Sequence, residues 1–66
     1  MKFKIDDDVK IKDIQGAAQE TGNEEKYFVG EFSIVDVLPD DDYPYCIMND
    51  YFFALWVKED EIELVQ

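Results

Sequence analysis

Three runs rich in aromatic and β-branched residues follow one another along this chain, and only short polar breaks separate them. The runs are residues 27–38 (YFVGEFSIVDVL), 43–48 (YPYCIM) and 51–57 (YFFALWV). Residues of these types favour the pleated, half-buried surface of a β-sheet. The breaks, residues 39–42 (PDDD) and 49–50 (ND), hold the Pro, Asp and Asn that favour turns. The sequence therefore predicts three consecutive strands, the last two joined by a tight hairpin.

Two further strands are predicted nearer the ends of the chain. Residues 9–14 (VKIKDI) alternate between aliphatic and charged, and residues 62–65 (IELV) place Ile62 and Leu64 on one face. Between the first and second strands, residues 15–26 (QGAAQETGNEEK) are polar and include two glycines. That composition predicts a long surface loop with at most one short helical turn.

Strand alternation predicts which residues form the core. In residues 51–57, Leu55 and Val57 are expected to face inward, which turns Phe52 and Trp56 outward. The residues expected to meet in the interior are Val9, Ile11, Val35, Leu55, Ile62 and Leu64.

Five strands in 66 residues are expected to form one domain, residues 1–66. A chain of about 60 residues buries only about 60% of its unfolded surface, which leaves no material for a second core. Gly30, within the long run 27–38, marks the expected position of a bulge, so that this strand could serve two sheets. The predicted fold is an all-β, closed or nearly closed small barrel, because closure removes the exposed edges of an open sheet.

The charge of the chain restricts its partners. Six lysines, no arginine and seventeen acidic residues give a formal net charge of −11. Nucleic-acid affinity depends on Lys and Arg that neutralise phosphates, so direct binding to nucleic acid or to an anionic membrane is not expected. The partner is expected to be cationic, either a basic protein surface or a metal ion. The N-terminal residues turn acidic too early for a signal peptide, and the uncharged runs are shorter than the about 20 residues that span a bilayer. We therefore expect a cytoplasmic location.

Catalysis and cofactor binding are not expected. The chain has no histidine, Ser33 lies within a predicted strand, and Cys46, the single cysteine, has no imidazole to activate it. We expect Cys46 to act as a small buried hydrophobe. The aspartate runs lack the alternating spacing that wraps a calcium ion, so no metal site is expected.

Three acidic clusters are expected to lie in or beside loops. They are residues 6–8, 40–42 and 59–61. One interpretation is that these charges only keep a ring-rich protein soluble. A sharper hypothesis is that they mimic a polyanion such as DNA and occupy the basic groove of a nucleic-acid-handling protein, with an encounter accelerated by electrostatic steering.

The rings are too numerous for the interior of so small a barrel. Some of them could shield the outer surface or plug the barrel ends. The alternative is a contact patch, because Trp and Tyr are preferred interface anchors. Such a patch beside acidic residues could bind a proline-rich or basic peptide, or it could pair two copies of the chain.

Several segments resemble a known group of proteins. Residues 9–13 (VKIKD), 30–37 (GEFSIVDV) and 44–65 (PYCIMNDYFFALWVKEDEIELV) look like the small SH3-like barrels of Gram-positive bacteria and their phages. The resemblance implies a five-stranded SH3-like small barrel, with a long loop after the first strand and a short helical turn before the last. It also implies a bacterial or phage accessory protein. This chain departs from the pattern in the three aspartates 6–8, where the group commonly has Gly-Asp, and in a hairpin without glycine.

The sequence as a whole predicts a non-catalytic, acidic protein-binding module that binds, and in one reading inhibits, a basic or nucleic-acid-handling host protein. The alternatives are an SH3-type module for a short peptide motif and a self-associating structural subunit. The residues predicted to make contact are Asp40, Asp41, Asp42, Tyr43, Tyr45, Tyr51, Trp56, Glu59, Asp60 and Glu61.

Overall fold

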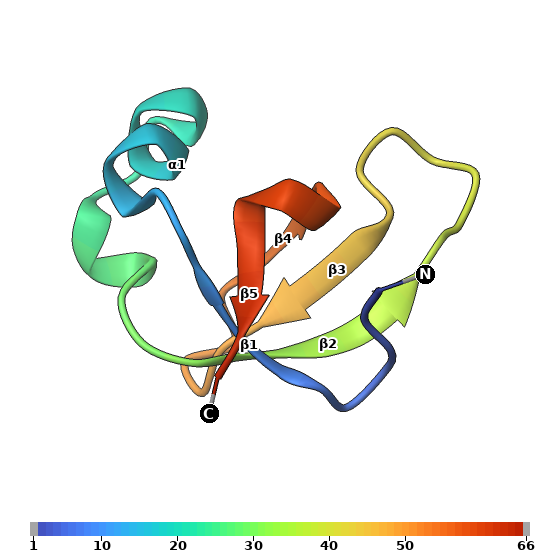
Figure 1. The fold of residues 1–66 in the computed structure, drawn as a ribbon. Helices are drawn as coiled ribbons and strands as arrows, with labels where there is room; N and C mark the ends of the chain where they lie inside the picture. Colours follow the sequence, from blue (N-terminus) through green and yellow to red (C-terminus); the bar gives the residue numbers. More distant parts are fainter. Residues whose placement is uncertain (1, 66) are drawn as a thin grey trace.

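Five antiparallel strands form a single sheet in the order β4–β3–β2–β1–β5 (Figure 1). The structure is a computed structural model and describes residues 2–65. The strands are β1 (Asp8–Ile11), β2 (Phe32–Val37), β3 (Tyr45–Met48), β4 (Ala54–Val57) and β5 (Ile62–Leu64). Within residues 2–65 the two outer strands, β4 and β5, do not pair with each other. The fold is therefore a small β-sheet protein with five strands as predicted, but it is not the closed barrel that the sequence suggested.

The strand β2 links the two halves of the sheet. Its first residues pair with β1, where Val9 lies opposite Phe32, and most of its length pairs with β3. The register shifts between Ile34 and Asp36, which is the signature of a bulge and lets the strand bend. The bulge predicted at Gly30 thus lies several residues later. Gly30 itself has a φ of 93° and lies just before the strand begins.

The predicted loop 15–26 is largely helical, which corrects the sequence-based expectation. Helix α1 spans Ile14–Thr21, and a 3-10 turn, η1, spans Glu25–Tyr27. Asp13 caps the start of α1 by accepting a hydrogen bond from the Gly16 amide at 3.0 Å. Gly22, with a φ of 73°, closes the helix in the left-handed conformation that glycine adopts without steric cost.

The core agrees with the sequence-based expectation only in part. Val9, Ile11 and Ile62 are buried as expected, whereas Val35 is 40% exposed and Leu64 is 48% exposed. Side chains along β2 alternate between the two faces of the sheet, and Phe32 and Ile34 face the core. Val35, the next residue after Ile34, therefore points away from the core. Leu55 is half-buried at the margin of the core. The remaining interior is filled largely by rings and by aliphatic residues of the central strands: Phe3, Phe28, Phe32, Ile34, Tyr45 and Ile47.

The connection between β3 and β4 is longer than the tight hairpin predicted at residues 49–50. It runs over residues 49–53, because β3 ends at Met48 and β4 begins at Ala54. The Asn49 side chain organises it by accepting hydrogen bonds from the amides of Tyr51 and Phe53, both at 3.0 Å. A second 3-10 turn, η2 (Glu59–Glu61), precedes β5, in agreement with the predicted helical turn at this point. None of the helices in residues 2–65 has the length and apolar content needed to cross a membrane.

Candidate functional site

The loop between β2 and β3 holds a carboxylate beside two aromatic rings. The Leu38 amide donates to the Pro44 carbonyl at 2.7 Å, and the Asp41 amide donates to the Leu38 carbonyl at 3.1 Å. The Asp41 Oδ1 in turn accepts a hydrogen bond from the Tyr43 amide at 3.0 Å. These bonds fix the loop and keep the Asp41 carboxylate at the base of the Tyr43 side chain.

Leu38, Asp41 and Tyr43 of this loop line an open hollow together with Trp56 of β4. The two rings are about equally exposed, at 42% for Tyr43 and 41% for Trp56. The Lys58 ammonium lies 5.1 Å from the centroid of the Tyr43 ring, within cation–π distance. One ring of this hollow therefore already carries a cation from the chain itself.

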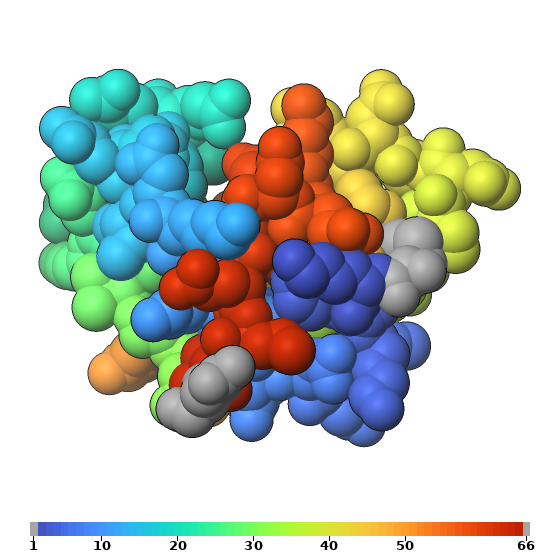
Figure 2. All heavy atoms as spheres, viewed as in Figure 1, coloured from blue at the N-terminus to red at the C-terminus, as the bar shows by residue number. Residues whose placement is uncertain are grey.

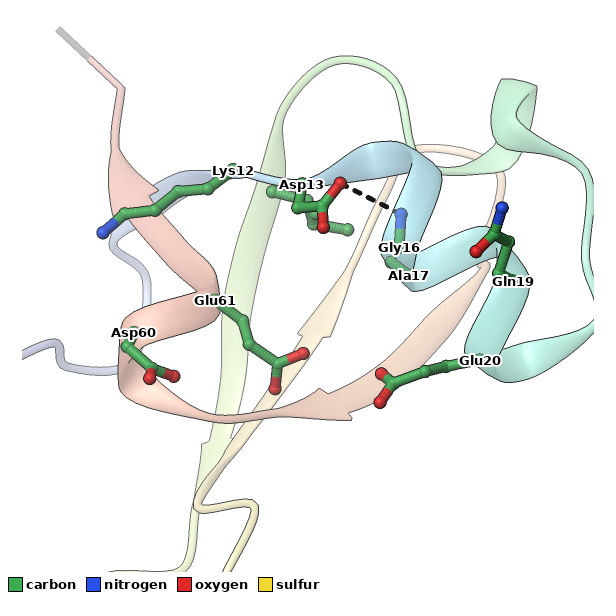
Figure 3. A pocket seen from close by; sticks show the side chains of 9 residues that line it. Lys12, Asp13, Gly16, Ala17, Gln19, Glu20, Asp60 and Glu61 are labelled. Atoms are coloured by element: carbon green, nitrogen blue, oxygen red, sulfur yellow. Dashed lines mark hydrogen bonds between the residues drawn. The ribbon is translucent and has the colours of Figure 1, made fainter.

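A second hollow of about 420 Å³ lies between α1 and η2. Figure 2 shows the notch that separates α1, in cyan, from the orange-red segment that contains η2. In Figure 3 the side chain of Glu20, from α1, and that of Glu61, from η2, extend toward each other across this space. Asp60 and Lys12 lie at its other end, and the Asp13–Gly16 cap forms part of the α1 wall.

A third hollow, of about 300 Å³, shares lining residues with each of the first two. It shares Tyr43 and Trp56 with the hollow beside the β2–β3 loop, and it shares Glu20 and Glu61 with the hollow between α1 and η2. Because neighbouring hollows share these lining residues, we describe the three together and call them the acidic groove. Its main residues are Ile11, Lys12, Asp13, Ala17, Glu20, Leu38, Asp41, Tyr43, Leu55, Trp56, Val57, Asp60 and Glu61.

Few lysines neutralise the carboxylates of the acidic groove. Among residues 2–65 the ion pairs are Lys10–Glu63 and Lys26–Glu24, both at 3.4 Å, and neither belongs to the groove. Lys12 also lines the groove, and a neighbouring hollow brings it and Lys2 and Lys58 near Asp42 and Glu59. None of these lysines comes within ion-pair distance of a carboxylate in residues 2–65. The groove therefore presents a local excess of negative charge.

The structure brings most of the predicted contact residues together. Asp41, Tyr43, Trp56, Asp60 and Glu61 line the acidic groove. Asp42 and Glu59 line the neighbouring hollow that also contains Lys2 and Lys58. Asp13, which caps α1, and Glu20, within α1, were not predicted as site residues, because residues 9–14 were expected to form a strand and residues 15–26 a loop. The cap pair Asp13 and Gly22 was the signal that could have revealed the helix.

Three predicted contact residues lie elsewhere. Tyr45 is fully buried, so its expected role as a surface anchor is wrong; its ring packs edge-on against Phe3 at 5.4 Å. Asp40 is exposed but lines none of the hollows described above. Tyr51, 87% exposed, belongs to the connection 49–53, which joins the opposite end of β4 from the groove's Trp56 end.

Cys46 is half-buried in β3. Burial raises the pKa of its thiol, and the nearby Asp36 carboxylate raises that pKa further. A raised pKa keeps the sulfur protonated and therefore weakly nucleophilic at neutral pH. Within residues 2–65, no group of three Cys, Asp or Glu side chains is arranged to hold a metal ion.

Comparison with known proteins bears on the fold. No family model matches the chain, and no curated protein matches its sequence. Among solved structures, the fold is similar to the NMR structure of Bacillus subtilis protein YorP, with a TM-score of 0.72 and 15% sequence identity. The match covers 100% of this chain and 73% of the YorP chain. At this level of identity the similarity concerns the fold alone: a small antiparallel β-protein with a structural relative in Bacillus subtilis.

Proposed function

We propose that this protein is a non-catalytic binding module that takes up a basic segment of a partner protein in the acidic groove. The observation that carries the proposal is the hollow formed by Asp41, Tyr43 and Trp56, in which a fixed carboxylate lies beside two half-exposed rings. Such a hollow suits a guanidinium or ammonium group. The cation can contact the ring faces by cation–π interaction and form a charge-assisted hydrogen bond with the carboxylate.

The distances support this assignment. Lys58 shows the interaction internally, with its ammonium 5.1 Å from the Tyr43 ring centroid. An exposed cation–π contact is worth about 0.5–1 kcal/mol, and an exposed ion pair adds about 0.2–1 kcal/mol. One cationic side chain would therefore bind weakly. A segment with several of them could also use Glu20 and Glu61 farther along the groove.

The charge of the molecule favours a basic partner over other classes. A net charge of −11 repels nucleic acid and attracts a basic surface, and steering of this kind raises association rates by about 10- to 1,000-fold. A basic protein that handles nucleic acid fits this description, and occupation of its basic surface would inhibit it.

For the finer fold class we propose an SH3-like, partly open barrel. Support comes from the β2 strand that serves both halves of the sheet and from the 3-10 turn η2 before β5. The relative in Bacillus subtilis, a Gram-positive bacterium, supports the proposed origin in such bacteria or their phages. A cytoplasmic location completes the proposal.

Self-association is a second candidate function, and one observation favours it. Tyr51 and Phe52 are 87% and 83% exposed at the tip of the connection between β3 and β4. Adjacent exposed rings on a hydrogen-bonded loop could pair two copies. Repulsion between two chains of charge −11 opposes that pairing.

A matched pair of variants tests the binding function. Trp56 is the single tryptophan of the chain and lies in the groove, so its fluorescence reports on the site directly. The probe is a capped hexa-arginine peptide, with hexa-citrulline as the uncharged control. We expect Asp41→Asn to weaken hexa-arginine binding by about threefold, the size of an exposed ion pair. Asp40→Asn removes the same charge outside the groove, so it should leave the affinity nearly unchanged.

Asn at position 41 keeps the oxygen that accepts the Tyr43 amide, so the loop geometry should survive the substitution. An equal loss of affinity in the Asp40 and Asp41 variants would mean that bulk charge, not the groove, attracts the peptide. Equal binding of the arginine and citrulline peptides, or no binding at all, would reject the proposed function.

A further inference from the structure

The outer edge of β4 carries backbone groups without a partner. The ladder between β3 and β4 ends with Met48 opposite Ala54, and one residue farther on the Asn49 amide donates to the Phe53 carbonyl at 3.0 Å. Bonded and non-bonded pairs alternate along such a ladder. Leu55 therefore bonds to β3, whereas the N–H and C=O groups of Ala54 and Trp56 point away from it.

No other described group satisfies these atoms. In residues 2–65, neither Ala54 nor Trp56 takes part in a hydrogen bond with a side chain or with backbone outside the ladder. The acidic groove reaches this edge, since Leu55, Trp56 and Val57 all line one hollow. The side chains of successive residues point to opposite faces of a strand. A hollow lined by three consecutive residues of β4 therefore has to run along the edge of that strand and not along one of its faces.

The other outer strand differs from β4. β5 has three residues, and the N-terminal segment lies beside it in Figure 2, where the dark blue residues adjoin the red ones. Lys2 and Phe3 line a hollow with Leu64 at that side of the sheet. Natural sheets protect their edges by shortening or covering them. β4 has four residues, ALWV, none of them charged.

Charge decides which occupant suits the β4 edge. Glu20 and Glu61 line the same hollow as Leu55 and Trp56 and have no ion-pair partner among the described residues. If two β4 edges paired, each copy would bring these carboxylates, and a net charge of −11, against those of the other. An extended segment that carries Lys or Arg would neutralise them instead.

We propose that β4 accepts an extended, basic segment of the partner protein as a sixth strand, bound through the backbone of Ala54 and Trp56. This inference rests on the proposed function and adds the conformation of the ligand to it. Strand addition supplies affinity through main-chain hydrogen bonds, and the flanking side chains supply specificity. Here the carboxylates of Glu20 and Glu61, together with the ring of Trp56, would select lysine or arginine.

Amide hydrogen exchange distinguishes strand addition from side-chain docking. The probe is a capped heptapeptide that alternates lysine and valine, added to the full chain labelled with nitrogen-15. We expect the amides of Ala54 and Trp56 to exchange at least about tenfold more slowly with the peptide bound, because each gains a hydrogen bond. The Leu55 amide, bonded to β3 already, serves as the internal control.

Peptides with N-methyl groups provide the second arm. One peptide is methylated on the lysine amides and another on the valine amides, so that each loses alternate donors. In strand addition, only every second amide of the peptide points toward β4. A shift by one residue would bring the other set of amides to β4, but it would also turn the lysine side chains to the opposite face of the sheet. We expect one methylated peptide to lose at least about tenfold in affinity and the other to bind as the parent does.

The outcomes separate this inference from the proposed function. If Trp56 fluorescence reports binding while the amides of Ala54 and Trp56 stay unprotected, or if both methylated peptides bind equally, strand addition is wrong and the cation hollow stands. If the heptapeptide fails to bind although hexa-arginine binds, the edge proposal is again rejected alone. Protection of the two amides that rises with protein concentration in the absence of peptide would assign the edge to a second copy and overturn the proposal.

Discussion

At the scale of single residues, Tyr45 has the most specific role. Its ring is fully buried, and its hydroxyl accepts a hydrogen bond from the Phe3 amide at 3.1 Å. The same hydroxyl donates to the Glu59 Oε2 at 3.2 Å. One side chain of β3 thereby attaches the N-terminal segment and the turn η2 to the sheet. Because η2 forms one wall of the acidic groove, Tyr45 supports the site from the inside.

Replacement of Tyr45 by Phe tests this role. The variant keeps the ring but leaves the buried Phe3 amide without an acceptor, and an unsatisfied buried group costs about 1–3 kcal/mol. We expect the free energy of unfolding in urea to fall by that amount. Tyr51→Phe is the matched control, because Tyr51 is 87% exposed and should unfold as the parent does. Equal stability of all three proteins would show that the Tyr45 hydroxyl contributes nothing.

At the scale of elements, the segments that the strand pattern does not specify are fixed by side-chain caps. Asp13 and Gly22 define the two ends of α1. Asn49 organises the connection 49–53, and its side-chain amide also donates to the Tyr27 carbonyl at 3.2 Å. That connection holds Phe52 at a φ of 62°, in the left-handed region, although its ring is 83% exposed. The strain has no compensating burial of the ring.

Glycine at position 52 should relieve this strain. A left-handed conformation costs a residue with a side chain about 1–2 kcal/mol, and glycine avoids this cost. Glycine also loses more backbone entropy on folding, which offsets part of the gain in stability. We expect Phe52→Gly to raise the free energy of unfolding by about 0.5–1 kcal/mol. Tyr51→Gly should lower it by about 0.5 kcal/mol, because Tyr51 has no positive φ to relieve. A loss of stability in the Phe52 variant would show that its exposed ring stabilises the loop.

At the scale of the whole molecule, charge is the dominant feature. Seventeen acidic residues and six lysines share a body of 28 × 24 × 19 Å. The two ion pairs in residues 2–65 are both exposed, and pairs of that kind contribute at most about 1 kcal/mol. Folding therefore concentrates negative charge with little local compensation. This excess of like charge opposes the compact state, because the charges repel one another.

Salt should accordingly stabilise the fold. Between about 0.01 M and about 1 M NaCl the Debye length falls from about 30 Å, longer than the molecule, to about 3 Å. We expect the midpoint of thermal unfolding to rise across this range as self-repulsion is screened. A variant with Glu31→Gln and Asp50→Asn, both exposed positions, should gain less from the same salt. A midpoint that falls with added salt would mean that attractive ion pairs outweigh repulsion.

The sequence by itself determined the strands and the charge. Alternating and β-branched runs encode strands locally, so the five strands and the turn at residues 39–42 could be predicted from the residues. The helical turn before Ile62 was expected only from the resemblance to SH3-like barrels. Only the tertiary structure decided that the sheet stays open, that Tyr45 lies inside, and that the side chains of Glu20 and Glu61 extend toward each other across one hollow. These features depend on the bulge in β2 and on the placement of α1, which are set by packing between residues distant in sequence and not by any local pattern.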